Sequence, residues 1–272
     1  MRREFLNLFL TWEIIALVAL AFVLFAAVFY FIVHRYLPTF LINPITHNTS
    51  AVYNILGITA ILLALTVVFL WQFFVNAQEA VSREASELKE IVMYTHKFTE
   101  TKANEVNDII GKYICVVVNK EWKMMSKGEY STEASKILQD LKLSLLQYSP
   151  SSANERIIYS KTLDNYEQVV LARGIRLEAI DSVIPGYFFV VIIINLLLLV
   201  ISVCLLDEKN KRAPFIIALL VATMAGTNLG LTISLDFPFS GDFAVSNDLF
   251  KEDILGELYQ KQVVLNSSMV SQ

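Results

Sequence analysis

The chain consists of four long apolar blocks separated by polar stretches in which apolar residues recur at helical spacing. The blocks occupy residues 14–33, 55–75, 183–206 and 213–235. Each has about 20 residues or slightly more, enough for a helix rising 1.5 Å per residue to cross a hydrocarbon core about 30 Å thick. Four such helices without a polar face are hard to bury in one small soluble domain. The pattern therefore predicts an all-α membrane protein with four transmembrane helices.

The first block has two interpretations. Arg2 and Arg3 precede it and it contains a small-residue Ala-Leu-Ala, as a cleaved signal peptide would. Apolar sequence nevertheless continues from Ala21 to residue 33, so cleavage there would leave a hydrophobic stump. We therefore predict an uncleaved span.

Residues 76–182 are predicted to form a helical bundle. The stretch NAQEAVSREASELKEIV continues the second block with no Gly or Pro. Its apolar positions form one stripe at four- and three-residue spacing, namely Ala77, Val81, Ala85, Leu88 and Val92. Further helices are expected at 103–125, 131–148 and 155–182, with Ser131 or Thr132 capping the middle one and Pro185 opening the third span.

The last part of the chain begins with a corner, SLDFPFSGDFAVSNDLFKEDI at residues 234–254. Pro238 and a turn at Gly241 are expected to end the fourth span and fold the chain back. Ser246 or Asn247 is expected to cap a terminal helix whose first turn is acidic. We interpret the segment as a structural corner, with a regulatory or cation-attracting rim as the alternative.

This pattern divides the chain into four parts. They are an N-terminal membrane hairpin (1–75), the bundle (76–182), a C-terminal membrane hairpin (183–235), and the corner with its terminal helix (236–272).

The distribution of Lys and Arg predicts the orientation in the membrane. The side that holds the middle segment carries seven near the span ends, namely Arg2, Arg3, Arg83, Lys89, Arg173, Arg176 and Lys251. The two short loops carry four, namely Arg35, Lys209, Lys211 and Arg212. Positively charged residues gather on the cytoplasmic side, so the middle segment and both termini are predicted to be cytoplasmic.

Composition narrows the function classes. Hydrophobic residues make up 55% of the 272 and charged residues 18%, which favours a membrane protein. The formal net charge of −4, without a basic run, does not indicate nucleic acid as a partner. Cys115 and Cys204 lie far apart and have no metal or redox spacing.

The sequence contains few residues in arrangements typical of catalytic sites. His34, His47 and His96 are scattered, and no nucleophile-elbow, zinc-protease or phosphate-loop motif is present. Four carboxylates crowd the first bundle helix, Glu79, Glu84, Glu87 and Glu90. A paired-carboxylate site is conceivable, but a solvated helix face is favoured. We expect neither an enzyme nor a cofactor or metal.

The spans suggest how helices associate. Ala218, Ala222, Gly226 and Gly230 recur at every fourth residue of the fourth block and form a face that another helix can approach closely. The neighbouring polar residues Thr223, Thr227 and Asn228, and Asn195 in the third block, are expected to bond between helices, or else to line a watery path. Lys, Arg, Asp and Glu are missing from the centres of all four blocks, which argues against a proton pump or voltage sensor.

Three stretches occur together and in order: FLWQFFVNAQEAVSREASEL, YICVVVNKEWKMMSKGE and LDFPFSGDFAVS. With them the chain resembles the bestrophin-like family of bacterial membrane proteins, distantly similar to bestrophin ion channels. The resemblance implies a homo-oligomer, expected to be a pentamer, in a bacterial inner membrane. It also implies that the second span lines a hydrophobic neck and that the C-terminal corner takes the place of the family's acidic segment after the last span. The corner residues are Asp236, Pro238, Phe239, Gly241 and Asp242, and its acidic residues are too sparse for a calcium clasp.

The neck position follows from the resemblance by counting back from Trp71, in place of the family's aromatic signature. The count gives Asn54, Ile58 and Leu62 as neck residues, with Ile61 expected on the opposite face. Glu79 and Glu84 are expected as charges at a pore mouth. The predicted function is an ion channel, with the lipid bilayer, other copies of the chain and permeating small ions as partners. The alternative is a non-conducting scaffold or signalling protein whose bundle binds a partner.

Overall fold

The computed structural model describes residues 2–36, 49–205 and 212–270, and these residues contain helices but no β-strand. The chain divides into two compact units. The first, here called the membrane unit, comprises residues 1–73, 182–237 and 241–243. The second, here called the bundle unit, comprises residues 74–181, 238–240 and 244–272.

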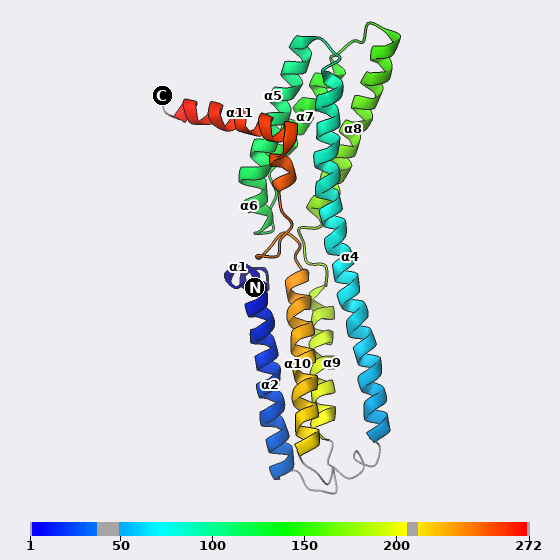
Figure 1. The fold of residues 1–272 in the computed structure, drawn as a ribbon, viewed down its shortest axis with the longest axis vertical. Helices are drawn as coiled ribbons and strands as arrows, with labels where there is room; N and C mark the ends of the chain where they lie inside the picture. The colour runs from blue at the N-terminus through cyan, green and yellow to red at the C-terminus, as the bar shows by residue number, and fades with distance from the viewer. Residues whose placement is uncertain (1, 37–48, 206–211, 271–272) are drawn as a thin grey trace. The chain divides into compact units, whose positions relative to one another are not determined.

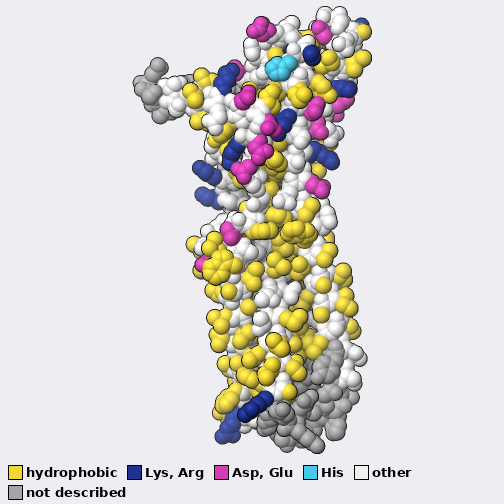
Figure 2. Space-filling view, in the orientation of Figure 1, with side chains coloured by type: hydrophobic (Ala, Val, Ile, Leu, Met, Phe, Trp, Pro, Cys, Tyr) yellow, Lys and Arg dark blue, Asp and Glu magenta, His cyan; other side chains and the backbone are white. Residues whose placement is uncertain are grey.

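The membrane unit contains the predicted spans. They are α2 (Thr11–Tyr36), the first part of α4 (Thr49–Thr95), α9 (Gly186–Cys204) and α10 (Arg212–Leu235). All four are long and apolar enough to cross a membrane, which confirms four spans. Within the unit, α10 packs along α2, and α9 contacts both (Figure 1). Hydrophobic side chains dominate the surface of these helices, as lipid-facing helices require (Figure 2).

The core of the membrane unit lies where α2, α9 and α10 meet. Its fully buried residues include Ala26, Leu196, Val200 and Ala222. A short helix that was not predicted, α1 (Arg2–Leu8), contributes Leu6, which packs with Ile14 and Phe237. The N-terminal residues therefore close the end of the unit where α2 begins.

In the part of the chain that the structure describes, the bundle unit is built from the rest of α4 and seven further helical segments. These are α5 (Glu100–Val116), the π-helix η1 (Val117–Glu121), α6 (Trp122–Met125), α7 (Thr132–Leu146), α8 (Ala153–Glu178), the 3₁₀ helix η2 (Asp248–Lys251) and α11 (Asp253–Val270). The predicted stripe on α4 is confirmed, because Ala77, Val81, Ala85, Leu88 and Val92 are all buried. Charged side chains gather on the surface of this unit (Figure 2).

Several helix boundaries differ from the expectation. The helix expected over 103–125 contains a π-helical turn, and the one expected to end at 182 ends at Glu178. Ser131 is confirmed as the cap of α7, since its Oγ accepts a hydrogen bond from Ala134 N at 3.3 Å. Ser152 caps α8 in the same way, through Glu155 N at 3.1 Å.

The terminal helix was expected to begin near Asp248 as one piece, which is wrong. Residues Asp248–Lys251 form a 3₁₀ turn, η2, and α11 begins only at Asp253. Asp253 has a φ of 51°, a conformation in which the α-helix cannot continue. Ser246 holds the 3₁₀ turn instead, by accepting a hydrogen bond from Asp248 N at 3.1 Å.

The short loops expected after the first and third spans fall mainly on residues 37–48 and 206–211. They lie outside the described residues, as do His47, Lys209 and Lys211.

Candidate functional site

The membrane part of α4 is the least covered of the four spans. Only 11% of its apolar window is buried within the chain, against 28% in α2 and α9 and 39% in α10. Asn54, Ile58 and Leu62 lie on its uncovered side, with Ile58 61% and Leu62 59% exposed. Leu56 and Leu63 are the α4 residues that pack against the core of the membrane unit. The described chain thus leaves a long alkyl surface without a partner.

Ile61 does not lie on the packed face, contrary to expectation. Its side chain is 63% exposed. Three residues along a helix turn the side chain by about 300°, so Ile61 points only about 60° away from Ile58. Leu56 and Leu63 are the residues that pack inward, so they lie on the opposite side of α4 from the exposed Ile58 and Leu62.

The two carboxylates expected at a pore mouth have different environments. Glu79 is exposed and lines a shallow cleft of the bundle unit with Asn76, Arg83 and Ile175. Glu84 is fully buried, which corrects the expectation that it is a solvent-facing charge. Glu84 belongs to an ion-pair network instead.

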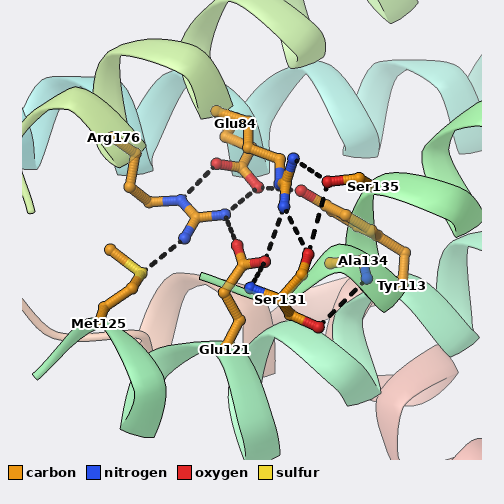
Figure 3. Close-up of polar contacts among 9 residues, drawn as sticks. Glu84, Tyr113, Glu121, Met125, Ser131, Ala134, Ser135 and Arg176 are labelled. Atoms are coloured by element: carbon orange, nitrogen blue, oxygen red, sulfur yellow. Dashed lines mark hydrogen bonds and ion pairs between the residues drawn. The ribbon is translucent and has the colours of Figure 1, made fainter. Parts of the chain in front are cut away.

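The network is centred on the guanidinium of Arg176 from α8 (Figure 3). Its Nε and Nη2 donate to the two Glu84 oxygens at 2.7 and 3.0 Å, and Nη2 also donates to Glu121 at 2.9 Å. Arg176, Glu84 and Glu121 are all completely buried. The fork of donors on one arginine therefore satisfies carboxylates from two different segments.

A second arginine completes the charge balance. Arg173 Nη2 donates to Glu121 at 2.7 Å and to the Ser131 carbonyl at 3.2 Å. Two buried arginines thus face two buried glutamates.

The π-helical turn η1 affects the direction in which Glu121 points. Glu121 is the last residue of this turn, and the extra residue of a π-turn shifts the side chains that follow it.

Tyr113 of α5 adds a neutral donor to the network. Its hydroxyl donates to Glu84 Oε1 at 2.6 Å. Burial, and next the Glu84 carboxylate, raise the pKa of Tyr113 well above its ordinary value. Burial by itself would lower the pKa of Arg176, but the nearby Glu84 and Glu121 carboxylates outweigh it and raise that pKa. The raised pKa values keep Arg176 charged and Tyr113 neutral.

The three stretches that carry the family resemblance converge on this network. Glu84 comes from the first, and Glu121 and Trp122 come from the second. Trp122 lies against Arg176, 5.2 Å from the guanidinium carbon to the ring centroid, and meets Phe239 of the third stretch edge-on at 5.7 Å. Trp122 Nε1 also donates to the Val245 carbonyl at 3.1 Å. The three stretches that occur together in the sequence therefore contact one another in the bundle unit, and the sequence analysis did not predict these contacts.

The small-residue face of α10 lies against α2. Ala218 and Ala222 are fully buried. A Cβ added at Gly226 would lie 2.5 Å from Ala19 Cα, and one added at Gly230 would lie 2.7 Å from Ile15 Cα. Two helix backbones therefore approach so closely that only glycine fits at these positions.

The polar residues of the spans bond within their own helices. Thr223 Oγ1, Asn228 Nδ2 and Asn195 Nδ2 donate to the carbonyls four residues earlier, at 2.8, 2.9 and 3.0 Å. Thr227 bonds in the same way. Within the described chain these groups form no bonds between helices, contrary to the favoured expectation, and are satisfied locally.

The corner residues divide between the two units. In the membrane unit, the Asp236 carboxylate accepts from Ser182 Oγ at 2.9 Å and from Ile184 N at 2.8 Å, which fixes the entry to α9. Asp242 Oδ1 accepts from Thr11 N at 2.8 Å and so caps α2. Gly241 has a φ of +84°, and its N donates to Asn7 Oδ1 at 3.0 Å.

In the bundle unit, the Pro238 carbonyl accepts from Val245 N at 2.8 Å and Phe239 is buried beside Trp122. Each corner carboxylate thus has protein donors. Among the described residues, no group of three or more His, Cys, Asp or Glu is placed to hold a metal ion.

The sequence profile of the Bestrophin-like domain matches residues 15–250. The chain belongs to the Bestrophin-like family. Among solved structures, a bacterial bestrophin homologue from Klebsiella pneumoniae with a single substitution matches with a TM-score of 0.67 and 11% identity, covering 93% of this chain and 98% of that one. A second single-substitution form of that homologue matches with a TM-score of 0.63 and 11% identity, covering 92% and 97%. No curated protein sequence matches the chain.

The Bestrophin-like match and the four apolar spans together make the chain an integral membrane protein with the bestrophin fold. The match includes α4, the network and most of the corner, because all of these lie between residues 15 and 250. The terminal helix α11 lies beyond it.

Proposed function

We propose that this Bestrophin-like chain is the subunit of a homo-oligomeric ion channel, a pentamer, whose narrowest part is lined by α4. The observation that carries the proposal is the uncovered alkyl surface of α4, together with family membership. A membrane helix with one side packed on its own chain and the other left free is suited to meet its copies around an axis.

The neck is proposed to be formed by Asn54, Ile58 and Leu62 from each copy. Ile58 and Leu62 are one helical turn apart and share a face, and Asn54 extends this face by another turn. Rings of branched alkyl groups repel water from a narrow passage and raise the barrier for ions of either sign. Selectivity is then left to charges outside the neck. Of the two glutamates considered for this role, only Glu79 is exposed, and we propose that it favours cations slightly.

The channel is proposed to lie in a bacterial inner membrane with the bundle unit and both termini in the cytoplasm. The Lys and Arg distribution supports this orientation. We propose that the buried network has a structural role, because fixed ion pairs without solvent access cannot attract permeating ions.

The test is ion flux through the purified protein in lipid vesicles. Ile58→Ala with Leu62→Ala should raise conductance or leak, since smaller side chains admit water to the neck. The matched control is Leu56→Ala with Leu63→Ala, which removes alkyl groups from the packed side of the same helix and should mainly lower stability. Both variants are compared with the parent only if their oligomeric mass in detergent is unchanged.

Two results would contradict the proposal. One is a folded, oligomeric Ile58→Ala, Leu62→Ala variant that conducts like the parent. The other is a monomeric parent protein without ion flux, which would favour the scaffold alternative, since a channel needs several copies of α4 around one axis.

A further inference from the structure

A cleft in the bundle unit, separate from the ion-pair network, is formed by α5, α7 and α11. Its volume is about 580 Å³, within the range of roughly 300–1,000 Å³ typical of small-molecule sites. Val116, Ile137 and Leu265 supply apolar surface from three different helices. A mostly apolar cleft with a few convergent polar groups is the usual form of a ligand site.

The charges around the cleft are not balanced. Its two carboxylates each have a lysine partner, since Lys261 Nζ lies 2.8 Å from Asp108 and Lys120 Nζ lies 2.6 Å from Glu133. Lys112 of α5 and Lys136 of α7 also line the cleft.

Neither Lys112 nor Lys136 has a hydrogen-bond or ion-pair partner among the residues that the structure describes. The two carboxylates are paired with Lys261 and Lys120, so among the described residues the two ammonium groups of Lys112 and Lys136 are left as unpaired charges in the lining of a cleft that also has apolar residues. Gln262 and Asn266 of α11 add amide groups on the third side.

We infer that this cleft binds a small organic anion, with one or two carboxylate or phosphate groups on an apolar body. The ammonium groups of Lys112 and Lys136 hold the anionic groups, and the surface of Val116, Ile137 and Leu265 takes the apolar body. The two requirements are complementary, because an anion without an apolar part leaves the apolar residues uncovered and an apolar molecule without charge leaves the lysines unpaired.

Such a ligand also affects the terminal helix. Within the bundle unit α11 packs on α5 through Gly111, where a Cβ would lie 2.9 Å from Gln262 Cγ. The later α11 residues Val264 and Leu265 are 64% and 44% exposed. Figure 1 shows the C-terminal end of α11 leaving the other helices of this unit. A ligand between α7 and α11 therefore adds a bridge that holds the end of α11. The inference does not depend on the proposed channel activity.

The experiment is hydrogen exchange of the purified full-length protein in detergent, followed at residues 253–270 while isophthalate is added. Isophthalate carries two carboxylates on an apolar ring and should slow exchange in α11. In the Lys112→Gln, Lys136→Gln variant the concentration for half of the effect should rise by about tenfold or more, because hydrogen bonds to charged groups are lost. The control variant, Lys97→Gln with Lys161→Gln, removes the same charge from two exposed positions of the unit that do not line the cleft, and it should behave like the parent.

Two further probes separate the requirements. Benzyl alcohol has the apolar ring without the charge, and inorganic phosphate has the charge without the ring. Both should be much weaker than isophthalate, and the isophthalate effect should decrease with added salt as the lysine charges are screened.

The inference is overturned if isophthalate at millimolar concentration leaves exchange in α11 unchanged, which is also expected if a second copy of the chain covers the cleft. It is equally overturned if the lysine variant responds like the parent, or if either comparison probe acts as strongly as isophthalate.

Discussion

Replacing Arg176 by methionine removes the cation at the centre of the buried network while keeping most of the side-chain length. The change deletes three charged hydrogen bonds, two to Glu84 and one to Glu121, all between 2.7 and 3.0 Å. It also removes the guanidinium that lies against the Trp122 ring. Glu121 keeps Arg173 as a partner, whereas Glu84 keeps the Tyr113 hydroxyl alone among the residues that the structure describes.

The magnitude follows from the uncompensated charge on Glu84. Removing one partner of a buried ion pair destabilises a protein by about 3–5 kcal/mol. For a chain of this size that corresponds to a drop in Tm on the order of 10 °C. Adding Glu84→Gln to Arg176→Met should recover roughly half or more of the loss, because a neutral amide replaces the stranded carboxylate.

The assay is thermal unfolding of the full-length protein in detergent, with hydrogen exchange in α8 as a second measurement. Lys261→Gln is the matched control, since it breaks the exposed pair with Asp108 and should cost at most about 1 kcal/mol. The reasoning is refuted if Arg176→Met unfolds within about 1 kcal/mol of the parent. It is also refuted if the double variant is no more stable than Arg176→Met alone.

Three other changes give independent tests. Gly226→Leu should disrupt the packing of α10 on α2 and so lower Tm or prevent folding. Gly57→Ala is the control and should be tolerated, because a Cβ at Gly57 meets nothing within 4 Å; equal effects of the two changes on thermal unfolding would contradict the close approach of α10 and α2. Tyr113→Phe should be less stable than the parent at neutral pH, and this difference should shrink as the pH rises above about 10. The phenol of the unfolded parent ionises there, whereas the folded phenol, with its raised pKa, does not. The parent therefore loses up to about 1.4 kcal/mol of stability per pH unit, and the variant, which has no phenol at this position, does not. A stability difference that stays constant between pH 9 and 11 in denaturant unfolding would oppose this. A cysteine introduced at Ser151 should not react with a membrane-impermeant maleimide in intact cells, and rapid labelling would mean that the bundle unit faces outward.

Local patterns in the sequence account for much of the fold. The four spans follow from the length of the apolar blocks, since a helix must be about 20 residues long to satisfy its backbone while crossing lipid. The buried stripe of α4 from Ala77 to Val92 follows from helical spacing, and the Ser131 cap follows from local hydrogen bonding. All of these depend on residues within about two turns of one another.

The break in the chain between η2 and α11 could not be predicted from such local patterns. The acidic residues from Asp248 to Asp253 are compatible with one helix start, and the sequence gives no sign of the positive φ at Asp253. The orientation of Ile61 was a different kind of error, because the helical period alone places it near Ile58.

The residues of the network show what the tertiary structure alone decides. Glu84 lies three residues after Val81 and four before Leu88, so helical spacing places it on the buried stripe of α4 and places the exposed Glu79 on the opposite side. The spacing does not give its partner, because Arg176 comes from α8, 92 residues later in the chain. The spacing of Gly226 and Gly230 predicts a close contact with another helix, but that this helix is α2 depends on the packing of the whole unit. Helical periodicity specifies which side chains share a face, whereas the partner of that face is set by contacts between segments far apart in the chain.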